Sequence, residues 1–212
     1  NSAVQRLKMF AEKQVAWHAD GWEIIQHEEH RGKRIEINGV TVRGQIDRID
    51  RRIEDGKAVY CILDYKTSDK AKTPSEAHVG PSFGDNEFLA AAQIPKELIA
   101  NSKTDKRWVD LQLPLYRHLV QALDIREPVG LGYVVLPKDT TKVGAALAPW
   151  TDTELAEADR AAGDVIRNVR AQRFWPPAQS PPPFCEEFAA ICQDDLFGGA
   201  AARDIEEEDE SA

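Results

Sequence analysis

Cysteine and long apolar runs are scarce in this sequence. The three cysteines, Cys61, Cys185 and Cys192, are too few for a disulfide framework, which favours a protein of the reducing cytoplasm. No apolar run approaches the ~20 residues that a membrane-spanning helix needs. Residues 1–20 mix charged and apolar side chains at helical spacing, unlike a signal peptide. We therefore expect a cytoplasmic protein that makes no membrane contact.

Positive charge is also in short supply, with 27 Lys and Arg against 36 Asp and Glu, for a net charge of −9. A general nucleic-acid binder usually carries a basic patch, so this balance argues mildly against one. Much of the excess lies in residues 203–212, whose sequence RDIEEEDESA holds six acidic residues and one basic residue. We expect a disordered acidic tail over residues 198–212. A domain that gathers carboxylates around a metal can be acidic and still touch DNA with a local basic rim.

What remains has the composition of a globular domain, with 42% hydrophobic and 30% charged residues. Apolar residues at helical spacing predict helices, and apolar residues that alternate between turns predict strands. We expect helices at 4–19, 110–123 and 151–172, strands at 22–28 and 129–136, and a meander of three strands over 33–66. This order predicts an α/β domain over residues 1–197, in which helices flank a mixed central β-sheet from 22–66 and 129–136.

Two aspartates are predicted to lie side by side in this sheet. Asp47 ends the segment Gly44-Gln-Ile-Asp, Asp64 opens the segment Asp-Tyr-Lys66, and one hairpin joins the two segments. Adjacent antiparallel strands would bring the two carboxylates close together, where they repel each other unless a cation neutralises them. A hard divalent ion such as Mg²⁺ suits such a site.

Lys66 is predicted to share the strand face of Asp64, because residues i and i+2 of a strand point to the same side. Its ammonium would then enter the pocket of the carboxylates, and a metal beside a lysine can hydrolyse a phosphodiester. Gln112 and Tyr116 lie one turn apart on the predicted helix 110–123, so they share a face that can look into a cleft and hold a substrate strand.

The three segments, GQID ending at Asp47, DYK from Asp64 and QLPLY from Gln112, together resemble the RecB-like branch of the PD-(D/E)xK nuclease superfamily. The resemblance covers roughly residues 20–195 and implies a restriction-endonuclease-like core. The segment GQIDRID, with its repeated Ile-Asp, and the segment QLPLY are most similar to the nuclease domain at the C-terminus of AddB-type helicase–nuclease subunits.

The resemblance implies a role for each of these residues. Asp47 and Asp64 would bind Mg²⁺ or Mn²⁺ with the backbone carbonyl of Tyr65 as a further ligand, and Lys66 would be catalytic. Gln112 and Tyr116 would contact DNA or brace the site.

The implied activity is exonuclease-like hydrolysis of DNA phosphodiester bonds, on single strands, in DNA repair and recombination. DNA would be one partner. The chain would be part of a larger helicase–nuclease-like protein, so its own helicase portion and a partner helicase–nuclease subunit are expected to be the others.

Two features depart from the family's pattern. Many RecB-like nucleases supply a metal-binding histidine from a helix before the first strand; His18 is on such a helix without an identifying motif, and Glu28 is another candidate acid ligand. AddB-type domains often hold an iron–sulfur cluster on four cysteines near the C-terminus, where this chain has only Cys185 and Cys192. We therefore expect no iron–sulfur cluster.

Other polar residues have structural interpretations. Arg48 and Asp50 are predicted to form an exposed ion-pair network. His78 could reach the pocket, although a solvated position is favoured, and Cys61 is expected to be buried as a small hydrophobe. For the whole chain, a catalytically silent DNA-binding or scaffolding module with the same fold is the main alternative. An acidic protein-binding module is a third interpretation, which rests on charge alone.

Overall fold

The computed structural model describes residues 2–27, 32–81, 92–98 and 103–173 of the chain. Residues 1–172 form one compact unit, and residues 173–212 are a second unit. The expectations for the acidic tail, for Cys185 and Cys192 and for Glu28 fall outside the described residues.

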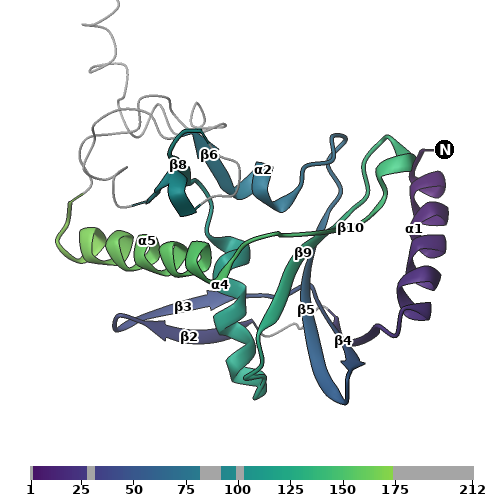
Figure 1. The fold of residues 1–212 in the computed structure, drawn as a ribbon, viewed down its shortest axis with the longest axis horizontal. Coiled ribbons are helices and arrows are strands. Elements are labelled where there is room, and N and C mark those ends of the chain that lie inside the picture. Colours follow the sequence, from purple (N-terminus) through teal and green to yellow (C-terminus); the bar gives the residue numbers. More distant parts are fainter. Residues whose placement is uncertain (1, 28–31, 82–91, 99–102, 174–212) are drawn as a thin grey trace, which may run out of the picture. The chain divides into compact units, whose positions relative to one another are not determined.

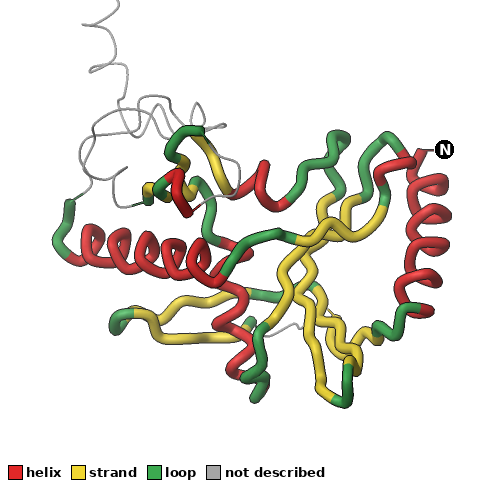
Figure 2. The backbone as a smooth tube through the Cα atoms, viewed as in Figure 1, coloured by secondary structure: helices red, strands yellow, loops and turns green. Residues whose placement is uncertain are grey.

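The central sheet has five strands in the order β1-β4-β5-β9-β10 (Figures 1 and 2). They are β1 (Glu23–His27), β4 (Arg48–Glu54), β5 (Lys57–Lys66), β9 (Val129–Val135) and β10 (Gly144–Leu147). The β5–β9 pair is parallel and the other three pairs are antiparallel, so the expected mixed sheet is confirmed. Asp55 and Gly56 both have positive φ, which lets a tight turn join β4 to β5.

Residues 33–44 form a separate hairpin and do not belong to this sheet. β2 (Lys33–Ile37) and β3 (Val40–Gly44) pair only with each other among the described strands, through a turn in which Asn38 and Gly39 have positive φ. The predicted hairpin is confirmed, but the three-stranded meander is wrong, because residues 45–47 leave the strand and β4 starts a new one. Gly44 lets α4 approach the hairpin closely, because a Cβ there would collide with the side chain of Leu119.

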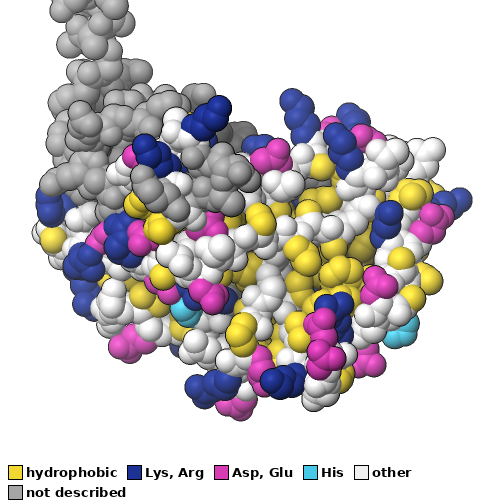
Figure 3. Space-filling model, in the orientation of Figure 1, with side chains coloured by type: hydrophobic (Ala, Val, Ile, Leu, Met, Phe, Trp, Pro, Cys, Tyr) yellow, Lys and Arg dark blue, Asp and Glu magenta, His cyan; other side chains and the backbone are white. Residues whose placement is uncertain are grey.

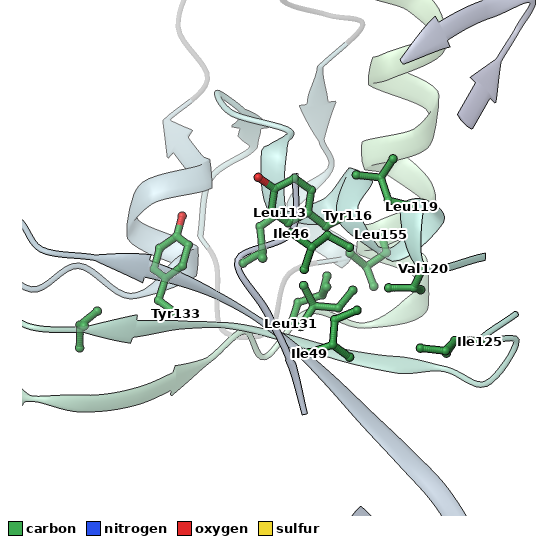
Figure 4. Packing of buried hydrophobic residues seen from close by; sticks show 12 residues of the cluster. Ile46, Ile49, Leu113, Tyr116, Leu119, Val120, Ile125, Leu131, Tyr133 and Leu155 are labelled. Carbon is green, nitrogen blue, oxygen red and sulfur yellow. The ribbon is translucent and has the colours of Figure 1, made fainter. Parts of the chain in front are cut away.

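Helices cover both faces of the central sheet, as expected. α4 (Gln112–Leu119), continued by the 3-10 turn η2 (Val120–Leu123), and α5 (Asp152–Arg170) contribute to one apolar cluster, whereas α1 (Ser2–Ala19) packs on the other face (Figure 1). Side chains of β5 alternate between the two: Ile62 joins the α4 side, and Cys61 and Leu63 join the α1 side. Figure 4 shows the α4 side. A capping box of Thr151 and Glu154 begins α5, the helix expected at 151–172.

The predicted helix over residues 4–19 is present as α1. Its apolar residues Val4, Leu7 and Val15 are exposed, whereas Phe10 and Trp17 pack against the sheet. Polar side chains also hold α1 on the sheet, since Arg6 donates to the carbonyl of Leu136 and Gln14 accepts from Arg48. No helix among the described residues is long and apolar enough to cross a membrane.

The crossover from β5 to β9 carries a small third sheet. The crossover contains α2 (Pro74–His78), β6 (Val79–Pro81), β7 (Gln93–Ile94), η1 (Lys96–Leu98) and β8 (Lys106–Trp108). The three strands form the small sheet in the order β6-β8-β7. A capping box of Thr73 and Glu76 begins α2. After β9, the turn η3 (Thr140–Lys142) leads into β10. The crossover ends with α4, which packs on the same face of the central sheet as Ile62 of β5.

Candidate active site

Asp47 and Asp64 lie opposite each other at one edge of the β4–β5 hairpin. Arg48 pairs with Leu63, so the next position along places Asp47 opposite Asp64. Asp47 Oδ2 accepts a hydrogen bond of 2.9 Å from the backbone N–H of Tyr65, which fixes its carboxylate beside β5. The predicted juxtaposition of the two carboxylates is therefore present in the fold.

Burial makes the charged form of Asp64 costly. Only 4% of Asp64 is exposed, and this burial raises the pKa of its carboxyl. The hydrogen bond and charge of Lys66 act in the opposite direction and lower that pKa, while the charge of Asp47 raises it further. The site therefore favours a bound cation, because a second positive charge would offset both the cost of burying the Asp64 carboxylate and its repulsion by Asp47.

Lys66 lies on the same side of β5 as Asp64, as its spacing predicts. Its Nζ lies 2.7 Å from Asp64 Oδ2 as an ion pair, and 4.9 Å from the centroid of the Tyr133 ring. A cation over an aromatic face is attracted by the ring quadrupole. The lysine is thus held between a carboxylate and an aromatic ring, with about a third of its side chain exposed (36%).

Tyr133 and His78 extend this site; the sequence indicated only that His78 could reach it, and it did not indicate Tyr133. The Tyr133 hydroxyl donates to Nε2 of His78, and Nδ1 of His78 donates to the carbonyl of Asp110 at 2.9 Å. His78 is completely buried, so the expectation of a solvated position is wrong. Burial lowers the pKa of His78, which keeps it neutral and able to accept from Tyr133. For Tyr133, the signal in the sequence was its hydroxyl within the apolar run of residues 129–136.

Gln112 and Tyr116 face the same region from α4. Gln112 Nε2 donates to the Tyr116 hydroxyl at 2.8 Å, and Asp110 Oδ1 accepts from the Gln112 backbone N–H at 2.7 Å. Burial raises the pKa of Tyr116; the Gln112 bond lowers it, and the charges of Asp64, Asp47 and Asp110 raise it. The hydroxyls of Tyr116 and Tyr133 point out of the aliphatic cluster (Figure 4). The predicted pair therefore sits within electrostatic range of the two carboxylates.

The donor set at this site suits a hard divalent ion. Mg²⁺ is usually bound through one or two carboxylates and keeps several waters, and this site offers two carboxylates with the carbonyl of Tyr65 next to them. The buried Asp64 Oδ2 faces the Lys66 ammonium at 2.7 Å, and the carboxylate still has further lone pairs that a metal could use. In the described parts of the chain, however, no three His, Cys, Asp or Glu side chains gather into a fuller metal cluster.

The candidate histidine ligand does not join the pair. His18 closes the turn between α1 and β1, where its Nδ1 lies 3.1 Å from the carbonyl of Trp22. Arg52 stacks over Trp22, and Arg52 lies far along β4 from Asp47. His18 therefore has a structural role at the opposite end of that strand.

Arg48 and Asp50 are buried, so the expectation of an exposed ion-pair network is wrong. Their side chains are 2% and 0% exposed, and two hydrogen bonds of 2.7 and 2.5 Å join guanidinium to carboxylate. Gln14 and Trp17 of α1 complete the network, with Trp17 Nε1 donating to Asp50 Oδ2 at 2.7 Å. Successive residues point to opposite faces of the sheet, so Asp47 points to the face covered by α4 and Arg48 to the face covered by α1.

A mixed sheet flanked by helices, with two carboxylates and a lysine on one hairpin, defines a restriction-endonuclease-like α/β domain. The chain matches the PD-(D/E)XK nuclease superfamily over residues 2–193. It therefore belongs to the PD-(D/E)XK nuclease superfamily, which indicates a nuclease that acts on nucleic acid. Nucleases of this superfamily usually use divalent metals. No curated protein matches the chain.

Two substitutions of Tyr133 separate stability from function. Tyr133→Phe removes the donor to buried His78 but keeps the ring under Lys66, so we expect a loss of about 1–3 kcal/mol in the free energy of unfolding with cleavage retained. Tyr133→Leu also removes the ring and should lower the cleavage rate. Urea unfolding and cleavage assays measure the two effects, and equal cleavage by both variants would show that the ring does not position Lys66.

Divalent metal should stabilise the fold through Asp64. Burial raises the folded pKa of Asp64 above its unfolded value of about 3.9. The folded state therefore loses stability as the pH rises from the unfolded pKa through the higher folded pKa. Metal that binds the carboxylate should restore about 2.7 kcal/mol at 100 times its Kd. Melting curves with and without Mn²⁺ should show a Tm increase that grows with pH. Asp64→Asn should remove most of that increase, and an undiminished increase would place the metal elsewhere.

Proposed function

We propose that this domain is a Mg²⁺- or Mn²⁺-dependent deoxyribonuclease that hydrolyses phosphodiester bonds of single-stranded DNA. The observation that carries the proposal is the cluster of Asp47, Asp64 and Lys66, in which two carboxylates and an ammonium lie together at one end of the β4–β5 hairpin. Superfamily membership supports the nuclease chemistry.

Each residue has a physical task in this proposal. Asp47, Asp64 and the Tyr65 carbonyl would hold the metal, which supplies a more acidic bound water and polarises a phosphoryl oxygen. The Lys66 ammonium stabilises negative charge that develops on the scissile phosphate, and the Tyr133 ring keeps the ammonium from swinging away. Gln112 and Tyr116, joined by their hydrogen bond, present a polar edge that positions the strand or braces the site.

The segments GQIDRID and QLPLY support a narrower assignment to an AddB-type nuclease domain. Such a domain would work with a helicase portion and a partner helicase–nuclease subunit in DNA repair and recombination. An exonuclease-like mode on single strands belongs to the same assignment, as does action in the cytoplasm.

Cleavage of end-labelled DNA tests the proposal. Single-stranded DNA, duplex DNA and RNA of one sequence are incubated with the chain in Mg²⁺, in Mn²⁺ and in EDTA. We expect cleavage of the single strand that EDTA abolishes, with products shortened progressively from an end. Binding of DNA without cleavage in any metal would instead identify a catalytically silent module with a nuclease fold. Preferred cleavage of duplex or RNA would overturn the assignment of the substrate.

A further inference from the structure

Two loops leave the same edge of the central sheet beside the candidate active site. Because β5 and β9 are parallel, the segments that follow Lys66 and Val135 emerge together. Two backbone hydrogen bonds join them, from Leu136 to the Lys66 carbonyl at 2.9 Å and from Lys138 to the Asp69 carbonyl at 3.1 Å. The first of these loops begins at the candidate catalytic lysine, so the pair forms a direct extension of the site.

Cations concentrate on this loop pair although the chain is acidic as a whole. Figure 3 shows Lys and Arg side chains along the upper edge of the molecule, where Figure 1 places the ends of β5 and β9. We call this surface the basic rim, and it consists of Arg6, Lys70, Lys72, Lys138 and Lys142. Lys138 and Lys142 have side chains that are 68% and 65% exposed, and Lys70 and Lys72 are exposed as well.

The carboxylates next to the basic rim form hydrogen bonds and ion pairs that hold its loops in place. Asp69 accepts from both Arg6 and Lys138 at 2.9 Å, and these bonds lower its pKa and tie α1 to both loops. Glu76 caps α2, and its bonds to Thr73 lower its pKa, helped by the charges of Lys72 and Lys142. Asp139 caps η3 through Thr141. The three carboxylates therefore hold the loops in place, and the cations outnumber them.

Lys70 and Lys72 carry the charge that is free for a partner. Neither side chain forms an ion pair with any described residue. Exposed ammonium groups beside a phosphodiesterase site match the phosphates of a strand that continues past the scissile bond.

We propose that the basic rim binds the phosphate backbone of the nucleic-acid strand on one side of the cleavage point. This inference rests on the nuclease function proposed above and adds to it the path of the strand. Asp69 is a structural residue in this arrangement, since its carboxylate joins α1 to both loops.

The test compares two double variants of the full chain. Lys70→Ala/Lys72→Ala removes the free cations of the rim. The matched control, Lys57→Ala/Arg126→Ala, removes two exposed cations at the opposite ends of β5 and β9. Binding of a fluorescently labelled 20-nucleotide single strand is measured by anisotropy over a salt series, with Ca²⁺ in place of Mg²⁺, and circular dichroism confirms the fold of each variant.

The rim variant should weaken binding on the order of tenfold at low salt and reduce the slope of log K against log salt by roughly 0.7 for each lysine lost. The control should keep the slope of the wild type. An unchanged slope in the rim variant, or an equal reduction in the control, would overturn the proposal, as would a wild type that does not bind. Cleavage is scored separately: a chain that binds through the rim but never cuts contradicts the nuclease function alone, and a chain that cuts with a slope indifferent to the rim contradicts this inference alone.

Discussion

Lys66→Ala should lower the rate of DNA cleavage by about 10²–10³-fold, which is the usual effect of removing one preorganised group that stabilises transition-state charge. The ammonium lies 2.7 Å from Asp64, so it sits where charge on a metal-bound phosphate would develop. The metal should still bind, because the carboxylates of Asp47 and Asp64 remain. Single-turnover cleavage of labelled single-stranded DNA measures the rate, and Mn²⁺ titration by calorimetry measures metal binding.

Lys57→Ala is the matched control, since it removes an exposed lysine from the other end of the same strand. It should cleave like the wild type. Lys66→Ala with full activity would remove the lysine from the mechanism. A variant that loses metal binding together with cleavage would instead make Lys66 a structural support for the carboxylates.

Asp50→Ala should destabilise the fold by about 3–5 kcal/mol, because it leaves the buried guanidinium of Arg48 without its counter-charge. The substitution also removes the acceptor of the Trp17 indole N–H, which loosens the contact between α1 and the sheet. Urea unfolding measures the change in free energy. The reduction should be large enough to lower the fraction of folded chain at ambient temperature.

The same strand contains an exposed pair with the same spacing, Arg52 and Glu54 at 3.0 Å, and Glu54→Ala should cost under about 1 kcal/mol. The double variant Arg48→Met/Asp50→Leu tests the cause, since it removes both charges and should recover much of the stability that Asp50→Ala loses. Equal losses for Asp50→Ala and Glu54→Ala would show that burial of the pair has little energetic weight.

The arrangement of Asp47, Asp64 and Lys66 could be predicted because it depends only on local rules. A tight turn after Glu54 fixes the hairpin, its register sets the two carboxylates opposite each other, and alternation along β5 brings Lys66 to the same side. Their catalytic and metal-binding roles stay predictions until cleavage is measured. The Gln112–Tyr116 pair was predictable for the same reason, since helical spacing alone places the two side chains together.

The rest depends on contacts between distant segments. His78 and Tyr133 meet only because the crossover returns to the sheet, and no pattern within residues 129–136 shows where the hydroxyl will point. Arg48 and Asp50 read as exposed because charged residues usually are, and only the docking of α1 buries them. The orientation of α1 depends on the same docking, since Arg6 and Gln14 form hydrogen bonds to residues distant in the sequence.

The parallel pairing of β5 with β9 also sets an order for folding. Asp47 and Asp64 are joined by a hairpin of low contact order, which forms quickly, whereas Lys66 meets Tyr133 only after the whole crossover has closed. During synthesis, a nascent chain that ends at α4 already contains both aspartates but lacks the ring on which the lysine rests. The carboxylate pair thus comes early and the contact of the lysine with the ring late, so that, under the proposed function, an incompletely folded chain would bind a cation before it could cleave a substrate.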